Sequence, residues 1–105
     1  MIEPLRIATR QDGQHTLVAV EGEVDMATAP QLERALLAVA AGDVVVDLTG
    51  VPFLDSSGIA TLVRAHRAVA GRGGQLTTTG EQSLVRHALE VTGLFEVLHP
   101  DGAVS

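Results

Sequence analysis

A short run of β-branched residues near the middle of the chain constrains the fold more than any other feature. It reads Asp43-Val44-Val45-Val46-Asp47-Leu48, with apolar side chains on successive positions. Strict alternation marks a strand with one solvated face, whereas a continuous apolar run of this length suits a central strand buried on both faces. Strands of that kind occur in sheets covered by helices, so the chain is predicted to be an α/β protein.

Strand and helix patterns alternate on both sides of this run. Residues 5–9 and 15–20 alternate with period two around the turn Asp12-Gly13 and are expected to pair antiparallel. The other predicted elements are a helix that starts at Thr28-Ala29-Pro30-Gln31 and stops at Gly42, a helix through residues 59–69, a strand at 75–79, a helix at 82–91, a strand at 95–98 and a tail at 99–105.

The start of the first helix carries a recognisable capping pattern. Thr28 is expected at the N-cap, Pro30 falls in the first turn, and Gln31 completes a capping box. The predicted order is then β-β-α-β-α-β-α-β, which implies right-handed crossovers and a mixed, mostly parallel sheet with an N-terminal antiparallel hairpin and three to four helices. At 105 residues, we expect a single domain over residues 1–105.

Composition excludes several classes of function. The net charge is −6, which argues against nucleic acid or an anionic membrane as partner. There is no cysteine, so disulfides and thiol chemistry are excluded. No long apolar segment or signal peptide is recognisable, and we expect a cytoplasmic protein.

One segment carries more polar chemistry than folding requires. Asp55, Ser56 and Ser57 lie where the apolar strand hands over to a helix, and Gly58 follows them. Helix N-termini present free N–H groups and favour negative charge, so this place suits a phosphate. For Asp55, helix capping and a functional role fit equally well and are compatible, whereas for Ser57 a place at the N-cap or first position of the helix is the better explanation. Gly58 is expected to allow close backbone approach.

No catalytic constellation is evident. The four histidines have no partners at metal-ligand spacing, a nucleophile elbow is missing, and the chain has no lysine for a phosphate-binding loop. No cofactor is therefore predicted, and the chain is not expected to be an enzyme. The remaining enzymatic hypothesis is a magnesium-dependent phosphotransfer site built from Asp25, Asp47 and Asp55, although solvated acids explain these residues more simply.

The chain closely resembles the STAS domain of bacterial anti-sigma factor antagonists. The resemblance runs over essentially the whole chain. It is carried by the Gly22-Glu23-Val24-Asp25 loop, the 44–48 strand, the Asp55-Ser56-Ser57-Gly58 motif and the closing Gly93-Leu94-Phe95.

The resemblance implies a partner-switching protein. Its unphosphorylated form would bind an anti-sigma factor that is also a serine kinase and carries the ATP, and so release a sigma factor. The kinase would phosphorylate Ser56, and a serine phosphatase would reverse this. Asp25, Asp55, Ser57 and Gly58 match positions at the partner-binding surface. The alternative is a STAS subunit of a transporter or sensory complex without a phosphorylation switch.

Overall fold

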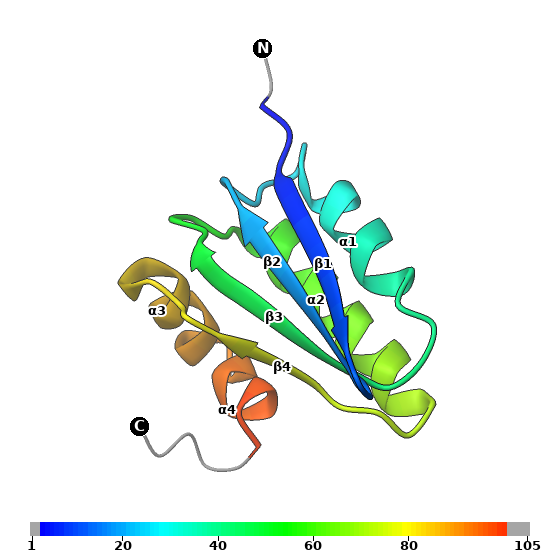
Figure 1. Ribbon diagram of the computed structural model, residues 1–105. Coiled ribbons are helices and arrows are strands. Elements are labelled where there is room, and N and C mark those ends of the chain that lie inside the picture. Colours follow the sequence, from blue (N-terminus) through cyan, green and yellow to red (C-terminus); the bar gives the residue numbers. More distant parts are fainter. Residues whose placement is uncertain (1–2, 101–105) are drawn as a thin grey trace.

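A computed structural model describes residues 3–100 as a four-stranded sheet with four helices (Figure 1). The strands lie in the order β1-β2-β3-β4, which is also their order along the chain. The elements are β1 (Arg6–Asp12), β2 (His15–Glu21), α1 (Ala29–Leu37), β3 (Asp43–Gly50), α2 (Ser56–Gly71), β4 (Leu76–Thr79), α3 (Ser83–Val91) and α4 (Leu94–Leu98).

The sheet has the mixed topology predicted from the sequence. β1 pairs antiparallel with β2 over seven residues, from Arg6 opposite Glu21 to Asp12 opposite His15. β2 and β3 are parallel, and so are β3 and β4. The α/β architecture with an N-terminal hairpin is therefore confirmed.

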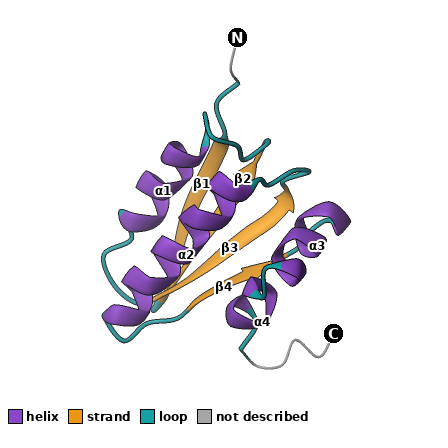
Figure 2. Cartoon of the chain, turned by 180° about the vertical axis from the view of Figure 1, so that it is seen from behind, coloured by secondary structure: helices purple, strands orange, loops and turns teal. Residues whose placement is uncertain are grey.

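The four helices of the described residues lie on one face of the sheet, and none of them covers the other face, which we call the open side (Figures 1 and 2). In β3, Val44, Val46 and Leu48 are fully buried on the helix side, whereas Val45 and Asp47 are only partly buried on the open side. The prediction of a central strand buried on both faces was wrong. The continuous valines reflect β propensity as well as burial, because β-branched side chains also suit a half-covered sheet.

The start of α1 is built differently from the predicted capping box. Thr28 occupies the N-cap position and Pro30 lies in the first turn, but the Thr28 side chain makes no cap hydrogen bond to the helix. The Gln31 amide instead bridges to the backbone of Leu5, accepting from its N–H at 2.8 Å and donating to its carbonyl at 2.8 Å. Gln31 therefore makes a long-range contact between α1 and the segment before β1 in place of the predicted local capping box.

The predicted last strand, residues 95–98, is the helix α4. Leu94 and Leu98 are both buried, and this spacing of four residues belongs to one side of a helix. Phe95 likewise stacks on His99, with ring centroids 4.1 Å apart. The strand prediction left out Leu94 and so missed the helical spacing. Of the expected tail, His99 and Pro100 are described and residues 101–105 lie outside the described residues.

The core fills the space between the sheet and the helices with aliphatic side chains, because the sequence has two phenylalanines and no tryptophan or tyrosine. The fully buried leucines are Leu32, Leu36, Leu48, Leu62, Leu76, Leu89 and Leu98.

In the part of the chain that the structure describes, no helix is both long enough and apolar enough to span a bilayer.

Candidate functional site

Two loops meet at the carboxyl ends of β2 and β3. The Val24 N–H donates to the Phe53 carbonyl at 3.0 Å, and the Asp55 N–H donates to the Val24 carbonyl at 3.1 Å. Val24 and Leu54 form an isolated parallel bridge between these bonds. Asp25 and Asp55 are therefore the residues that leave this bridge, one toward α1 and one toward α2. The two acidic loop residues are brought together, as parallel strand ends predict.

Asp55 is the N-cap of α2. Its Oδ1 accepts hydrogen bonds from the Ser57 N–H at 2.8 Å and the Gly58 N–H at 3.2 Å. The helix begins at Ser56, so Ser57 is its second residue and not the cap. The Asp55 carboxylate already uses two of the first-turn N–H groups that a phosphate would otherwise bind. The prediction of a helix start with free N–H groups was correct only in part.

Ser56 is the most accessible residue of the motif. It is exposed at the first position of α2, whereas Asp55 and Ser57 are half-buried and Gly58 is buried. The side-chain hydrogen bonds in this motif run from the Ser57 and Gly58 N–H groups to the Asp55 carboxylate. Among residues 3–100, none involves the Ser56 hydroxyl. The hydroxyl is therefore free to meet another molecule.

Gly58 faces the interior of the protein. A Cβ at this position would lie 2.5 Å from Leu54 Cδ1, 2.8 Å from Val24 Cγ1 and 2.9 Å from Leu54 Cγ. The close approach predicted here is present, and the groups that come close are the two side chains of the loop bridge. Gly58 thus lets α2 sit directly on the bridge that carries Asp25 and Asp55.

The Asp25 carboxylate organises its own loop. Its Oδ1 accepts hydrogen bonds from the Ala27 N–H at 2.9 Å, the Thr28 N–H at 3.0 Å and the Thr28 hydroxyl at 3.2 Å. The Thr28 hydroxyl in turn accepts from the Asp25 N–H at 3.0 Å and lies 2.8 Å from the Glu23 carbonyl. This turn holds the next residue, Met26, in an exposed position.

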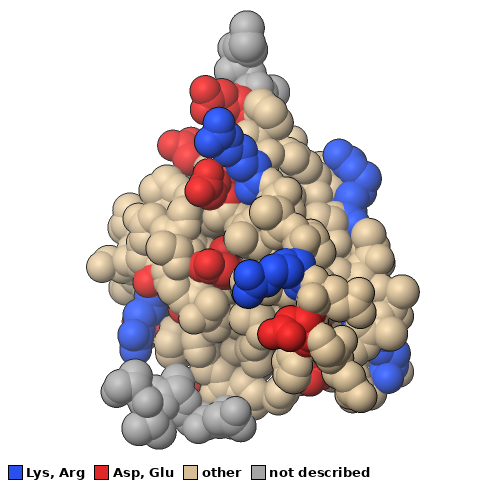
Figure 3. All heavy atoms as spheres, in the orientation of Figure 1, with Lys and Arg blue, Asp and Glu red and all other residues tan. Residues whose placement is uncertain are grey.

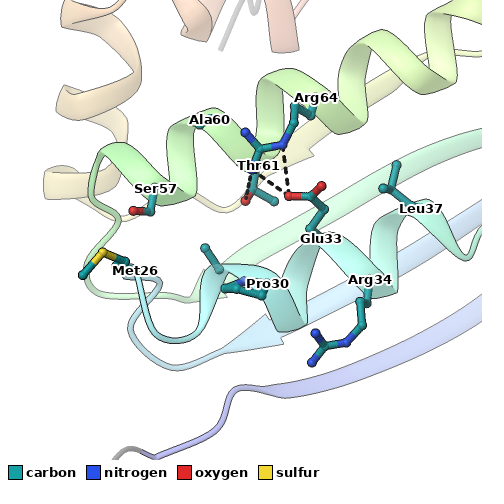
Figure 4. A pocket seen from close by; sticks show the side chains of 10 residues that line it. Met26, Pro30, Glu33, Arg34, Leu37, Ser57, Ala60, Thr61 and Arg64 are labelled. Atoms are coloured by element: carbon teal, nitrogen blue, oxygen red, sulfur yellow. Dashed lines mark hydrogen bonds and ion pairs between the residues drawn. The ribbon is translucent and has the colours of Figure 1, made fainter.

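A groove between α1 and α2 begins beside the motif and was not foreseen from the sequence (Figure 4). Met26 and Ser57 lie at one end of it, and the hollow measures about 500 Å³. Met26 is 79% exposed and Phe53, in the other loop, is 44% exposed. The apolar Met26, between Asp25 and Ala27 in a loop before the first helix, was the signal that could have indicated it. The groove is lined by Met26, Ala29, Pro30, Glu33, Arg34, Leu37, Ser57, Ala60, Thr61 and Arg64.

An ion pair crosses this groove. Arg64 on α2 donates from Nη2 at 2.7 Å and from Nε at 3.0 Å to the same carboxylate oxygen of Glu33 on α1. The hydrogen bond from Arg64 lowers the pKa of Glu33, and the same bond raises the pKa of Arg64. Both side chains reach solvent, so the ion pair adds little to the stability of the fold. Its main effect is to link α1 and α2 across the groove.

The magnesium hypothesis finds no support in the geometry. Asp47 is engaged locally, because its Oδ1 accepts from the Thr49 hydroxyl at 2.6 Å and the Thr49 N–H at 2.9 Å, and these bonds lower its pKa. Within residues 3–100, no group of three or more His, Cys, Asp or Glu side chains is placed to hold a metal ion. Asp47 therefore does not join Asp25 and Asp55 in a ligand set.

The histidines have separate structural surroundings. His15 lies 3.6 Å from Asp43 at the start of β3 and is largely exposed. His99, expected in the tail, has a side chain that is 17% exposed and lies 2.7 Å from the Glu81 carboxylate. Thr78 also bonds to that carboxylate. These contacts fasten the end of α4 to β4 and to the loop after it.

Comparison with known proteins gives a consistent result. The family described as "Mlab, STAS domain" matches residues 7–99. The anti-sigma-B factor antagonist of Listeria monocytogenes is 33% identical over 91 residues, which are 84% of this chain and 80% of the relative. The crystal structure of an anti-sigma factor antagonist from Mycobacterium paratuberculosis has a TM-score of 0.78 at 30% identity and covers 86% of this chain and 79% of that one.

A more distant structure shares the fold. The anti-sigma factor antagonist SpoIIAA in its unphosphorylated form has a TM-score of 0.74 at 18% identity, over 88% of this chain and 84% of that one. Anti-sigma factor antagonists are regulatory proteins and not enzymes, in line with the sequence prediction. The family match over residues 7–99, together with relatives at 30% identity or more over most of the chain, shows that this chain belongs to the STAS-domain family of anti-sigma factor antagonists.

Proposed function

We propose that this chain is a cytoplasmic antagonist that binds an anti-sigma factor while Ser56 is unphosphorylated and releases it when Ser56 carries a phosphate. In this proposal the anti-sigma factor is itself the serine kinase and brings the ATP, and a separate serine phosphatase restores the binding form. The single observation that carries the proposal is the position of Ser56. It is the exposed first residue of a helix whose cap, Asp55, already occupies the neighbouring amides.

The surface around Ser56 suits a protein partner. Met26 and Phe53 are exposed apolar side chains on the two loops that meet at the Val24–Leu54 bridge. Apolar residues concentrated beside a polar motif are typical of an interaction surface. Asp25 and Asp55 fix the two loops, so we infer that they act on the partner mainly by holding this surface in shape. Ser57, at the mouth of the groove, is placed to touch the partner directly.

A phosphate on Ser56 would meet negative charge. Phosphorylation adds about −1.5 to −2 charges at neutral pH, next to the Asp55 carboxylate. Because Asp55 takes the Ser57 and Gly58 amides, the phosphate cannot bind those amides without displacing the cap. It would therefore point outward into the partner surface, unpaired within its own chain. A loss of about 2–3 kcal/mol would weaken binding roughly 100-fold.

A protein of the same fold offers a precedent for such a change. SpoIIAA has been solved in an unphosphorylated and in a phosphorylated form, at 18% and 16% identity to this chain. At this distance the likeness concerns the fold alone. The assignment of Ser56 as the acceptor therefore depends on its own exposure and its place in the Asp55–Gly58 motif.

The test uses the kinase-type anti-sigma factors encoded in the same genome. The wild-type chain, Ser56→Ala and the matched control Ser83→Ala, at the exposed first residue of α3, are each incubated with kinase and ATP and weighed by intact-mass spectrometry. We expect a gain of about 80 Da, one phosphoryl group, in the wild type and in Ser83→Ala but not in Ser56→Ala. Phosphorylation of Ser56→Ala at the wild-type rate would exclude Ser56 as the acceptor.

A binding measurement separates the switch from the alternative subunit role. We expect the phosphorylated wild type to bind the anti-sigma factor about 100-fold more weakly than the unphosphorylated chain. If Ser56 stays unmodified with every such kinase, and the chain instead copurifies from its host with a membrane transporter, the STAS-subunit alternative is the better assignment.

A further inference from the structure

The outer edge of β1 is a long, exposed strand edge. β1 pairs with β2 on one side only, and in the described part of the chain no other strand pairs with its outer side. Six of its seven residues are exposed, and Ile7 is the exception. Outward N–H and C=O groups of an edge strand are a template for another strand. The opposite edge of the sheet, β4, is four residues long and offers a shorter one.

The side chains of β1 fall into two sets. Thr9 and Gln11 line a hollow on the helix side, together with residues at the end of α1. Arg6, Ala8, Arg10 and Asp12 alternate with these residues and so lie on the open side, where Arg6 is 3.8 Å from Glu21 on β2. Figure 3 shows this side, with acidic and basic groups next to one another. The edge therefore carries a defined charge pattern as well as free backbone groups.

The charge pattern favours one way of pairing β1 with a second copy of itself. In an antiparallel pair centred on Thr9, all seven residues are paired, and Arg6 lies opposite Asp12 of the second copy at both ends. Centring the pair on Ala8 would put Arg6 opposite Arg10, and centring it on Arg10 would put the two Arg10 residues opposite each other. Like charges directly opposite are destabilising, so only the pairing centred on Thr9 combines full length with attraction.

The helix side of the edge agrees with this register. Ile7 of the second copy would lie opposite Gln11. At this place a hollow of about 460 Å³ lies on the helix side of the sheet, beside the half of β1 that contains Thr9 and Gln11. The walls of this hollow are mostly apolar. They comprise Thr9, Gln11, Thr16, Ala35, Ala38, Val39, Ala40 and Ala41. An isoleucine that is only partly buried in one copy would thus gain apolar neighbours from the other.

We propose that two copies of this chain associate through antiparallel pairing of β1 with β1, centred on Thr9, to form a continuous eight-stranded sheet. The contact is isologous, so it closes as a dimer and does not propagate. An edge-to-edge contact buries less surface than a standard stable interface, and the dimer should form reversibly at high protein concentration. Ser56 lies on α2 and not on β1, so the surface proposed to bind the kinase stays open.

The experiment follows the mass of the full chain by sedimentation equilibrium over a range of concentrations. Wild type should rise from the monomer mass toward twice that value. Arg6→Asp alone and Asp12→Arg alone place like charges at both ends of the pair, and each should remain monomeric. An equimolar mixture of the two variants restores opposite charges at both ends of a mixed dimer, and it should associate as wild type does.

The control is Arg67→Asp, which makes the same charge change at an exposed position of α2 and should associate like wild type. Far-UV circular dichroism of each variant shows that it is folded. A wild type that stays monomeric throughout overturns the proposal, and so does a wild-type dimer that survives Arg6→Asp. Folded single variants that fail to associate on mixing overturn the register centred on Thr9.

Discussion

Gly58 offers a test of how the site is built. A glycine at this position either allows α2 to pack closely on the loop bridge or leaves room for the partner protein, and Gly58→Ala separates these two explanations. If Gly58 packs α2 onto the loop bridge, Gly58→Ala must destabilise the fold. A new Cβ would lie 2.5 Å from Leu54 Cδ1 and 2.8 Å from Val24 Cγ1. Ordinary carbon–carbon contacts are about 3.5–4.0 Å long, so both buried side chains would have to move by about an ångström.

The magnitude follows from two opposing contributions. Overpacking of this kind costs about 1–3 kcal/mol in free energy of unfolding. Replacing glycine by alanine in a helix returns up to about 1 kcal/mol. We therefore expect Gly58→Ala to lose about 1–2 kcal/mol net. For a domain of this size, the midpoint of thermal unfolding should fall by roughly 5–10 °C.

Gly71, at the other end of the same helix, is the matched control. Nothing lies within 4 Å of a Cβ built there, so Gly71→Ala should leave stability unchanged or raise it by up to about 1 kcal/mol. Urea denaturation of the wild type and both variants gives the comparison. If Gly58→Ala is as stable as the wild type, the packing explanation is refuted. A stable Gly58→Ala that no longer binds the kinase would show that Gly58 contacts the partner itself.

Three further predictions concern stability. Asp55→Ala removes the cap of α2 and should lower the free energy of unfolding, measured by urea denaturation, by about 1 kcal/mol. Asp55→Asn can still cap and should lower it by only a few tenths of a kcal/mol, roughly. Equal losses in the two variants would contradict the capping role of Asp55. Burial by itself raises the pKa of Glu81. The hydrogen bonds that its carboxylate makes with Thr78, with the backbone and with His99 together outweigh burial, so the pKa of Glu81 is lowered. This stabilisation is present above about pH 4–5 and is lost as pH falls through the lowered pKa, and Glu81→Gln should flatten the acid limb of a stability–pH curve. Gly80→Ala should destabilise by more than 1 kcal/mol, because Gly80 has φ +75° and its Cβ would lie 2.1 Å from the Thr49 hydroxyl oxygen; unchanged thermal unfolding would show that this loop can relax.

Much of the fold could be predicted because local patterns and tertiary packing agree there. The hairpin at Asp12-Gly13 and the alternation of strands and helices follow from turn chemistry and hydrophobic spacing, and the structure has both. The prediction failed where a long-range contact decided a residue's role. Gln31 left its capping box for the backbone of Leu5, and residues 95–98 became a helix because Leu94 and Leu98 are buried together.

The candidate site divides in the same way. The motif Asp55-Ser56-Ser57-Gly58 was evident from residue types at a strand-to-helix boundary. Its details were not, since capping by Asp55 and by Ser57 read alike in sequence, and only the hydrogen bonds to the Ser57 and Gly58 amides assign the cap to Asp55. The groove behind Met26 was missed altogether, because it is formed by two helices separated by a strand in sequence.

By itself, the sequence determined the order of elements as far as α3, the mixed sheet and the position of Ser56 at the start of α2. These depend on interactions between residues near one another in the chain, which turn and periodicity rules capture. Only the tertiary structure decided that Gly58 faces inward, that Asp25 and Asp55 leave the same bridge, and that, among the described residues, the outer edge of β1 is unpaired. Each of these depends on which distant segments come into contact. Local patterns do not encode that, because burial and strand pairing are properties of the packed whole.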